Sequence, residues 1–507
     1  MDPNQQRARV IIRHCDEYDP ERIRVIVREA LEELDLRPHG RTLLKPNIVM
    51  AGDEFKHAYT RPEFVEGVLK GLQDRDAGQL TELAVGERCG ITVPTRFAFE
   101  QSGMGEMIKR QKNVKQYNFE EEPQVEIPLT HKDRLRDYVF TPEPVAKADF
   151  FVNCPKFKAH PWTTVTFGNK AYIGIQDDRH RLIDHDTKLE EKIADLQYII
   201  QPQFLAIDAI VAGEGRMLTP IPRKLNLIIM GNNQCAFDAV CCAIIGVDPN
   251  KVPHIRLPHE RGFGPLDLSR IEITGDVSLE EAQARAQGFK VGLIRVEKYF
   301  EGTNITAYAG SPPASEKTDY CWGGCPGALE EAVEILRVFD AETDAKLPRM
   351  HIVFGNYQGE IDAKPGERVI FIGDCAQWKG QLGERLVEVE NLYKHRSTLD
   401  PYTIQAEDAL TKQIKTRLVL KSAEGKSHLR LQGCPVSVAE QVQTLVALGG
   451  LPDPARSWPG MKSFLVWKSK MLVKKLGGHK YQIPGPTQRG EAAPVVVDPS
   501  PTGAAAE

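Results

Sequence analysis

The sequence predicts an α/β fold built from two domains with largely parallel sheets, the second of them flavodoxin-like. Three observations lead to this prediction. Short apolar runs suited to strands alternate with longer amphipathic patterns suited to helices, which is typical of parallel sheets whose strands are joined by helices. The chain has 507 residues, which is too many for one hydrophobic core. Its 41% hydrophobic and 27% charged residues are the proportions of an ordinary globular protein.

The first predicted domain covers residues 1–276. Strands are expected at 8–13, 41–45, 80–87, 148–156, 202–211 and 224–231, and helices at 23–34, 94–110, 188–199 and 236–245. One further helix is predicted to begin at Thr60, Pro62 and Glu63, because a hydroxyl cap, an early proline and an acid near the helix dipole favour a helix start. The alternation ends near Gly275.

A connecting segment is expected at 277–317, with one helix near 279–287, and the second domain at 318–456. Helices are predicted there at 327–338, 381–389 and 436–447, and strands at 349–354, 367–372 and 427–432. Residues 457–483 form a basic segment in which 461–476 predicts an amphipathic helix. That helix either packs on its own protein or contacts a partner or a membrane surface. Residues 484–507 are rich in Pro, Gly and Ala and are expected to be disordered.

Charge and hydropathy exclude several classes of protein. A net charge of −5 gives no reason to expect nucleic acid as a partner. No apolar run reaches the roughly 20 residues that span a bilayer. The N-terminus lacks the apolar core of a signal peptide, so a cytoplasmic protein is expected. In that reducing compartment cysteines bind metal or stay reduced.

The ten cysteines fall into two groups. Six lie in apolar or mixed stretches of the first domain and are expected to be mostly buried core residues: Cys15, Cys89, Cys154, Cys235, Cys241 and Cys242. Cys154 is also a candidate for the site loop, because it lies among the polar residues discussed below. The other four cysteines lie in the second domain.

Each of these four cysteines lies in a turn that contains glycine or proline. Cys321 and Cys325 belong to Cys-Trp-Gly-Gly-Cys-Pro before a predicted helix, whereas Cys375 in Gly-Asp-Cys and Cys434 in Gly-Cys-Pro each follow a predicted strand. Such turns point backbone N–H groups at sulfur, and ligands of open α/β sheets bind at the carboxyl ends of strands. One pair plus two single cysteines fits a 4Fe–4S cluster better than zinc, which usually takes two close pairs. Zinc, another metal or no metal remain alternatives.

This order of cysteines resembles the small subunit of nickel–iron hydrogenases and the related subunit of complex I. The resemblance covers about 130 residues and implies that the four cysteines hold a 4Fe–4S cluster. Two departures are visible. The first pair here is Cys-x-x-x-Cys, and one proline follows Cys434 where those families commonly have two.

Polar and basic residues follow several predicted strands of the first domain. The candidate catalytic residues are Lys45, Asn47, Lys156, Lys158, His160, Lys170 and Glu214. If their loops converge, the lysines form a positive pocket suited to a carboxylate or phosphate, although solvated surface lysines are the alternative. His180 and His185 are candidate general bases or metal ligands, or part of a solvated polar loop. No dinucleotide fingerprint, Walker loop or serine elbow is present.

Four motifs in this region together resemble the domain of unknown function 362 family over residues 8–275: LLKPN, NCPKFKAHPWTTVTFGNKAYIGI, AIDAIVAGEGR and AFDAVCCAIIGVDP. Members of that family are often accompanied by iron–sulfur modules, but the family label implies no reaction. One departure is the continuation Glu214-Gly215-Arg216-Met217, where the family often has Gly-Pro.

The function expected from these features is an iron–sulfur oxidoreductase that acts on an anionic small molecule, under anaerobic conditions and with a redox partner such as a ferredoxin. The two domains should then face each other across a cleft, with the cluster supplying electrons and a Lys or His supplying the proton. One alternative is an electron-transfer or assembly protein without its own substrate. Another is a non-redox lyase or isomerase with a structural cluster.

Overall fold

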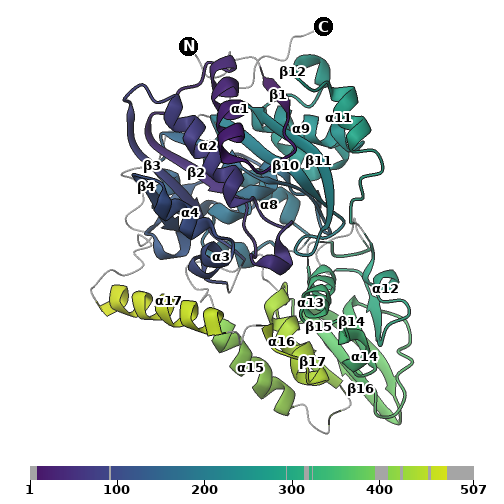
Figure 1. Cartoon of the computed structure of the whole chain (residues 1–507). Coiled ribbons are helices and arrows are strands. Elements are labelled where there is room, and N and C mark those ends of the chain that lie inside the picture. The colour runs from purple at the N-terminus through teal and green to yellow at the C-terminus, as the bar shows by residue number, and fades with distance from the viewer. Residues whose placement is uncertain are drawn as a thin grey trace.

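The computed structural model of the chain shows a larger N-terminal α/β unit and a smaller C-terminal one (Figure 1). The structure describes residues 8–90, 93–185, 187–292, 294–312, 319–322, 324–393, 409–422, 426, 428–454 and 458–476. The tail predicted to be disordered, 484–507, lies outside the described residues.

The N-terminal unit is built on a sheet of ten strands. They are β1 (Arg9–His14), β2 (Gly40–Pro46), β3 (Leu80–Glu87), β4 (Val114–Asn118), β7 (Phe150–Cys154), β8 (Lys156–His160), β9 (Thr164–Val165), β10 (Phe204–Glu214), β11 (Ile221–Gly231) and β12 (Glu272–Gly275). The main path runs β12-β1-β11-β10-β7-β2-β3-β4, with β8 pairing β10 and β9. A separate hairpin consists of β5 (Gln124–Pro128) and β6 (Tyr138–Pro142).

The strands β4, β3, β2, β7 and the start of β10 are parallel, which confirms the predicted α/β class. β7 is buried along its whole length, as is usual for a strand covered on both faces. The sheet is mixed at the other edge, because β10 and β11 form an antiparallel hairpin and β11 pairs antiparallel with β1.

Eleven helices accompany this sheet within the described residues: α1 (Pro20–Glu33), α2 (Pro62–Asp74), α3 (Thr95–Gln101), α4 (Met104–Arg110), α5 (Glu143–Ala146), α6 (Phe167–Ala171), α7 (Asp178–Leu182), α8 (Leu189–Leu196), α9 (Gln234–Ile244), α10 (Pro253–Glu260) and α11 (Leu279–Arg285). The helix predicted at 94–110 is two helices, because Gly103 adopts a positive φ of 78° between them.

The predicted hydroxyl cap of α2 is wrong. Arg61 occupies the N-cap position, and its backbone N–H donates to Asp208 Oδ2 at 3.1 Å. The Thr60 hydroxyl instead accepts from the Asn47 N–H at 3.0 Å and donates to the Cys154 carbonyl at 2.8 Å. Thr60 therefore ties together the chain segments that leave β2 and β7.

The C-terminal unit contains β13 (Ile305–Ala309), β14 (Met350–Asn356), β15 (Arg368–Leu382), β16 (Arg385–Val389) and β17 (His428–Leu431), with α12 (Val296–Tyr299), α13 (Cys325–Phe339), α14 (Thr343–Lys346), α15 (Ala409–Ser422), α16 (Val438–Gly449) and α17 (Trp458–Leu476). β13, β14, β15 and β17 are parallel neighbours in that order. This sequential order differs from the flavodoxin order 2-1-3-4-5. β13 lies within 277–317, so the sheet begins inside the segment expected to be a connection.

The helix predicted at 381–389 is wrong, because β15 continues to Leu382 and forms an antiparallel hairpin with β16. Gly383 makes the turn with a φ of 61°. Burial alternates along β16, with Leu386 exposed and Val387 and Val389 buried, which is the two-residue period of a strand.

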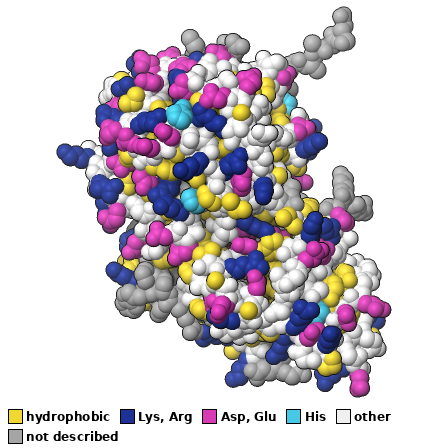
Figure 2. All heavy atoms as spheres, turned by 45° about the vertical axis from the view of Figure 1, so that its right-hand side comes forward, with side chains coloured by type: hydrophobic (Ala, Val, Ile, Leu, Met, Phe, Trp, Pro, Cys, Tyr) yellow, Lys and Arg dark blue, Asp and Glu magenta, His cyan; other side chains and the backbone are white. Residues whose placement is uncertain are grey.

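α17 covers the segment predicted to be an amphipathic helix and packs near α3 (Figure 1). Its side chains Leu465, Leu472 and Leu476 are exposed. Among the helices in the described ranges, none is both long and apolar enough to cross a membrane. The face shown in Figure 2 carries basic and acidic side chains interspersed, without a dominant charge.

Candidate functional site

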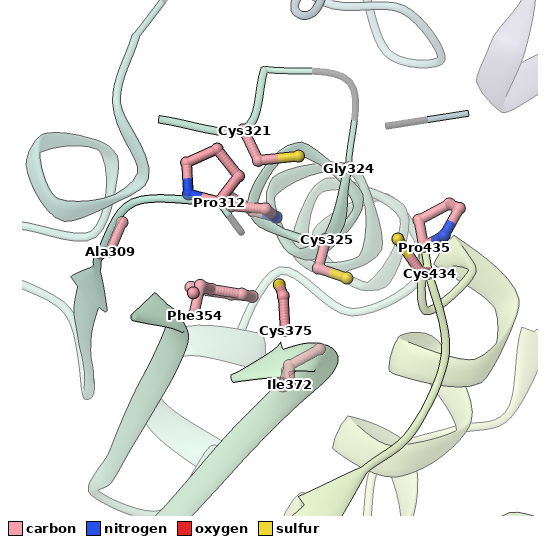
Figure 3. A pocket seen from close by; sticks show the side chains of 13 residues that line it. Ala309, Pro312, Cys321, Gly324, Cys325, Phe354, Ile372, Cys375, Cys434 and Pro435 are labelled. Carbon is pink, nitrogen blue, oxygen red and sulfur yellow. The ribbon is translucent and has the colours of Figure 1, made fainter. Parts of the chain in front are cut away.

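The four cysteines of the C-terminal unit line one pocket (Figure 3). Cys321 lies in the loop before α13 and Cys325 is the first residue of α13, whereas Cys375 lies in β15 and Cys434 follows β17. Three chain segments that are distant in the sequence, 321–325, the middle of β15 and the turn after β17, therefore converge at the start of one helix. The remaining wall is mainly apolar and is formed by Ala309, Gly310, Pro312, Gly324, Pro326, Phe354, Gly355, Ile372 and Pro435.

Glycines and backbone groups shape this pocket in the middle of β15 and just after β17. Gly373 has a φ of 104°, and a Cβ there would lie 3.3 Å from Cys325 Sγ and 3.5 Å from Cys375 Sγ. The Val436 N–H donates to Cys325 Sγ at 3.2 Å, as the sequence led us to expect of such turns. Asp374 fixes the two turns to each other, because its N–H donates to the Gly433 carbonyl and its carboxylate accepts from the Gly433 N–H.

Burial raises the pKa of the Cys325 thiol, and the neighbouring Cys375 raises it further. This thiol is therefore neutral unless a bound cation stabilises its thiolate. In the described part of the chain, no three His, Cys, Asp or Glu side chains are grouped closely enough to hold a single metal ion. The six cysteines of the N-terminal unit are all buried, as predicted.

The candidate lysines of the N-terminal unit are buried instead of lying in solvated loops. Lys45, at the end of β2, donates to Glu87 Oε2 at 2.9 Å, and Lys156, in β8, donates to Asp208 Oδ2 at 2.8 Å. All four side chains are at most 2% exposed. Since each ammonium already has a carboxylate, these two lysines hold strand ends together and have no charge left for a ligand.

Lys158 and Lys170 have no such carboxylate among the described residues. Lys158 Nζ donates to the carbonyls of Ala58 at 2.7 Å and Met217 at 3.0 Å. The ammonium of Lys170, on α6, has no hydrogen-bond or ion-pair partner in that part of the chain. Burial lowers the pKa of both lysines to about 7, and the positive charge of Lys170 contributes to the lowering at Lys158.

The remaining candidates of the N-terminal unit are also buried. Asn47 and Glu214 are each 6% exposed, and each has one side-chain oxygen without a partner among the described residues. His160 Nδ1 accepts from the N–H groups of Trp162 and Thr163, and burial lowers the pKa of His160 well below its usual value. The positive charges of Lys170 and Lys158 contribute to this lowering of the His160 pKa.

The interpretation of His180 as part of a solvated loop is wrong, because it is 3% exposed and packs edge-on against Tyr138 and Phe140. His185 is half-buried and packs edge-on against Trp162.

Sequence reasoning missed three residues of this region. Asn169, Trp162 and His254 each carry a buried polar atom without a partner among the described residues. Asn169 lies in the Gly-Asn-Lys motif directly before Lys170, so the motif itself could have indicated it. His254 lies 84 positions after Lys170 on α10, and nothing local in the sequence marks it.

The two units are in direct contact where β10 ends. Arg216 donates to Glu330 Oε2 at 2.6 Å, and the N–H groups of Met217 and Leu218 donate to Glu331 at 3.0 and 3.2 Å. Both glutamates belong to α13, the helix that begins at Cys325. The lysine-bearing region and the cysteine-bearing helix are therefore joined by buried polar contacts.

Comparisons with known proteins concern mainly the N-terminal unit. Residues 42–243 match the model of a family described as "Domain of unknown function (DUF362)". The thylakoid-associated protein sll1697 of Synechocystis sp. is 24% identical over 248 residues, which cover 45% of this chain and 70% of that protein. The lactate racemase apoprotein from Thermoanaerobacterium thermosaccharolyticum is similar over 70% of both chains, with 10% identity and a TM-score of 0.32, which is too low to support an argument. Residues 42–243 are therefore similar to the DUF362 family, and the rest of the chain lies outside this match.

Proposed function

We propose that the protein is an iron–sulfur oxidoreductase that holds a 4Fe–4S cluster on Cys321, Cys325, Cys375 and Cys434 and acts on an anionic small molecule. The observation that carries the proposal is the convergence of these four cysteines, from three separate segments, on one mainly apolar pocket. A pocket with mainly apolar walls and a backbone N–H directed at one of its sulfurs suits a cluster ligated by thiolates.

The spacing of the cysteines favours a cluster over a single ion. Around one zinc ion all four sulfurs bind the same atom at about 2.3 Å and must lie close together. In a cubane each thiolate binds a different iron at a different corner, so the sulfurs stand further apart. The structure brings the four cysteines to one pocket, and a cluster bound through four separate irons is the arrangement we propose for it.

The lysine-bearing region supports an anionic substrate. Lys158 and Lys170 are buried cations without carboxylate partners in the described chain, and buried charges require compensation. A carboxylate or phosphate would supply it. The contacts of Met217 and Leu218 with α13 connect this region to the cysteine-bearing helix. A bound cluster would exchange single electrons with the substrate, and a redox partner such as a ferredoxin would resupply them.

The solvent exposure of the cysteine pocket and of the candidate lysines favours an enzyme over a pure electron carrier. Cys321, Cys375 and Cys434 are partly exposed, which leaves an entry point for electrons from a partner. The candidate lysines, in contrast, are buried and do not form the broad charged face that a carrier would use to dock.

The test is the iron and sulfide content and the EPR spectrum of the full chain, purified without oxygen from iron-replete cells. Wild type should contain about four irons per chain and give a reducible signal. The variants Cys375→Ala and Cys434→Ala should lose most of the iron and the signal. Cys235→Ala, at a buried position of α9 far from the pocket in sequence, is the matched control and should keep both. Folded wild type without iron, or variants that keep the wild-type signal, would contradict the proposal.

A further inference from the structure

Polar side chains without partners gather around Lys170 inside the N-terminal unit. Among the described residues, both amide atoms of Asn169, the Nε2 of His160 and the Nε1 of Trp162 are buried and have no hydrogen-bond partner. Buried polar groups are nearly always paired, and each exception calls for an explanation such as a missing ligand or water. Several exceptions in one place indicate a site.

These side chains belong to one neighbourhood. The rings of His160 and Trp162 lie 5.4 Å apart, and the charge of Lys170 is one of the causes that lower the pKa of His160. Asn169 and Lys170 are consecutive residues of α6, which packs against β8, the strand that ends at His160.

We propose that Lys170, His160, Asn169 and Trp162 form an internal site for a small oxyanion, a carboxylate or a phosphate, and that Trp162 closes this site against the cysteine-bearing helix α13. The site deepens the proposed function, and its role next to α13 rests on that function. Binding of the anion itself does not require the cluster.

The chemistry of the groups without partners decides the class of ligand. His160 Nδ1 accepts two backbone N–H groups, so the proton of the neutral ring is on Nε2, which makes this nitrogen a donor. Trp162 Nε1 and the Lys170 ammonium are donors only, and Asn169 adds its NH₂ group. The unpaired groups of this neighbourhood are therefore mostly donors, one of them a cation, with the Asn169 Oδ1 as an acceptor beside them, and this excess of donors fits an oxyanion.

Neighbouring charged groups do not neutralise this site. Glu190 accepts from His254 Nδ1 at 2.6 Å, and the Asp238 carboxylate accepts from the N–H groups of Gly168 and Asn169 at 2.8 Å. Both carboxylates are thus engaged with other groups, and Lys170 lies within ion-pair distance of neither. An external anion is therefore needed to compensate the ammonium.

The segment from β9 to the first residue of α6 contains two residues in a conformation that L-residues rarely adopt. Thr164 and Phe167 have φ values of 64° and 41°. Left-handed conformations at threonine and phenylalanine cost energy, and such residues concentrate at functional sites. Here they lie between Trp162 and Asn169 in the sequence, so the strained loop sets the positions of both.

Trp162 links the site to α13 through one glycine. A Cβ built on Gly327 would lie 1.5 Å from Trp162 Nε1, so the indole lies directly over the backbone of α13. Gly327 comes two residues after Cys325. The indole therefore contacts both His160, at the anion site, and the first turn of the helix that carries a cysteine of the pocket.

The first experiment measures binding of acetate and inorganic phosphate to the full chain by isothermal titration calorimetry at pH 6, with chloride as the only other anion. Wild type should bind at least one of them saturably, and Lys170→Met should bind it at least tenfold more weakly. Lys147→Met, which removes an exposed lysine of the same unit, is the control and should bind like wild type. Trp162→Phe keeps an aromatic side chain but loses the indole N–H, so it should weaken binding several-fold even if Lys170→Met folds poorly.

The proposed anion site is contradicted if wild type shows no saturable binding. It is also contradicted if both Lys170→Met and Trp162→Phe bind with wild-type affinity. Iron content measured on the same samples separates the two proposals. If iron-free wild type binds the anion, the proposed anion site is supported and the proposed cluster is contradicted. If iron-loaded protein binds neither anion, the anion site is contradicted and the cluster is supported. In iron-loaded protein, the bound anion should also shift the EPR signal in wild type but not in Gly327→Ala, whose new methyl group displaces the indole.

Discussion

Lys170 and Lys156 are two buried lysines of the same unit that differ in one respect. Lys156 is paired with Asp208 at 2.8 Å, whereas the Lys170 ammonium has no carboxylate partner among the described residues. Replacing either by methionine removes the charge and keeps an unbranched side chain of similar length. The two substitutions should change the stability of the ligand-free protein in opposite directions.

The magnitude at Lys170 follows from its pKa. Burial lowers this pKa from 10.5 to about 7; the positive charges of Arg181 and Lys45 act in the same direction, and Glu190 opposes them. At roughly 1.36 kcal/mol per pH unit, the charged lysine destabilises the folded state by up to about 5 kcal/mol. Between pH 7 and 10.5 the unfolded chain binds more protons than the folded one, so stability rises with pH across this window.

The penalty is therefore complete below pH 7 and absent above pH 10.5. Lys170→Met should be more stable than wild type by up to about 5 kcal/mol at pH 6 and by about 2 kcal/mol at pH 9. Lys156→Met leaves Asp208 buried without its cation and should lose on the order of 3 to 5 kcal/mol.

The assay is urea unfolding of the full chain at pH 6 and pH 9, followed by far-UV circular dichroism in chloride buffers without carboxylate or phosphate. Adding phosphate at pH 6 should then stabilise wild type by mass action and leave Lys170→Met unchanged.

Two results would refute this reasoning. If Lys170→Met is no more stable than wild type at pH 6, the ammonium is compensated in solution. If its gain is the same at both pH values, the effect comes from packing and not from charge. A stable Lys156→Met would refute the contrast between the paired and the unpaired lysine.

Three further predictions concern the pocket, the contact between the units and pH. Gly373→Ala forces a Cβ into a left-handed position 3.3 and 3.5 Å from two cysteine sulfurs, so iron content should fall several-fold while far-UV circular dichroism stays unchanged. Arg216→Met removes the hydrogen-bond partner of Glu330, and burial raises the pKa of Glu330 to about 7. Because the unpaired carboxylate is neutral at pH 6 and charged at higher pH, the substitution should increase proteolysis between the units more at pH 8 than at pH 6. The affinity for phosphate should decrease as the pH rises through 7, because the free Lys170 ammonium loses its proton there, and Lys170→Met should lose this pH dependence.

The cysteine positions were predictable from local sequence. Each of the four has glycine or proline as a near neighbour, and the structure places all four at one pocket, although the turn expected at Cys375 is wrong because β15 continues through it. Turn residues and strand periodicity are local properties, so they can be read without knowledge of the tertiary fold. The error at 381–389 arose because a short apolar run fits a helix or a strand equally well, and only the pairing of β15 with β16 decided between them.

The roles of the lysines were not predictable in the same way. The sequence indicated Lys45, Lys156, Lys158 and Lys170 with equal weight. The structure separates them, because Glu87 lies 42 positions from Lys45 and Asp208 lies 52 positions from Lys156. Pairing across such separations depends on strand order and register, which no local pattern contains.

Local sequence patterns were enough to predict the α/β class, the four cysteines of one site, and the motifs of the region that matches DUF362. Tertiary structure alone decided which buried charges are compensated and which are not. It also placed Trp162 over Gly327, in the first turn of the cysteine-bearing helix. The physical reason is that electrostatic compensation and close packing depend on distances between side chains far apart in the sequence, whereas helix, strand and turn preferences depend on neighbours.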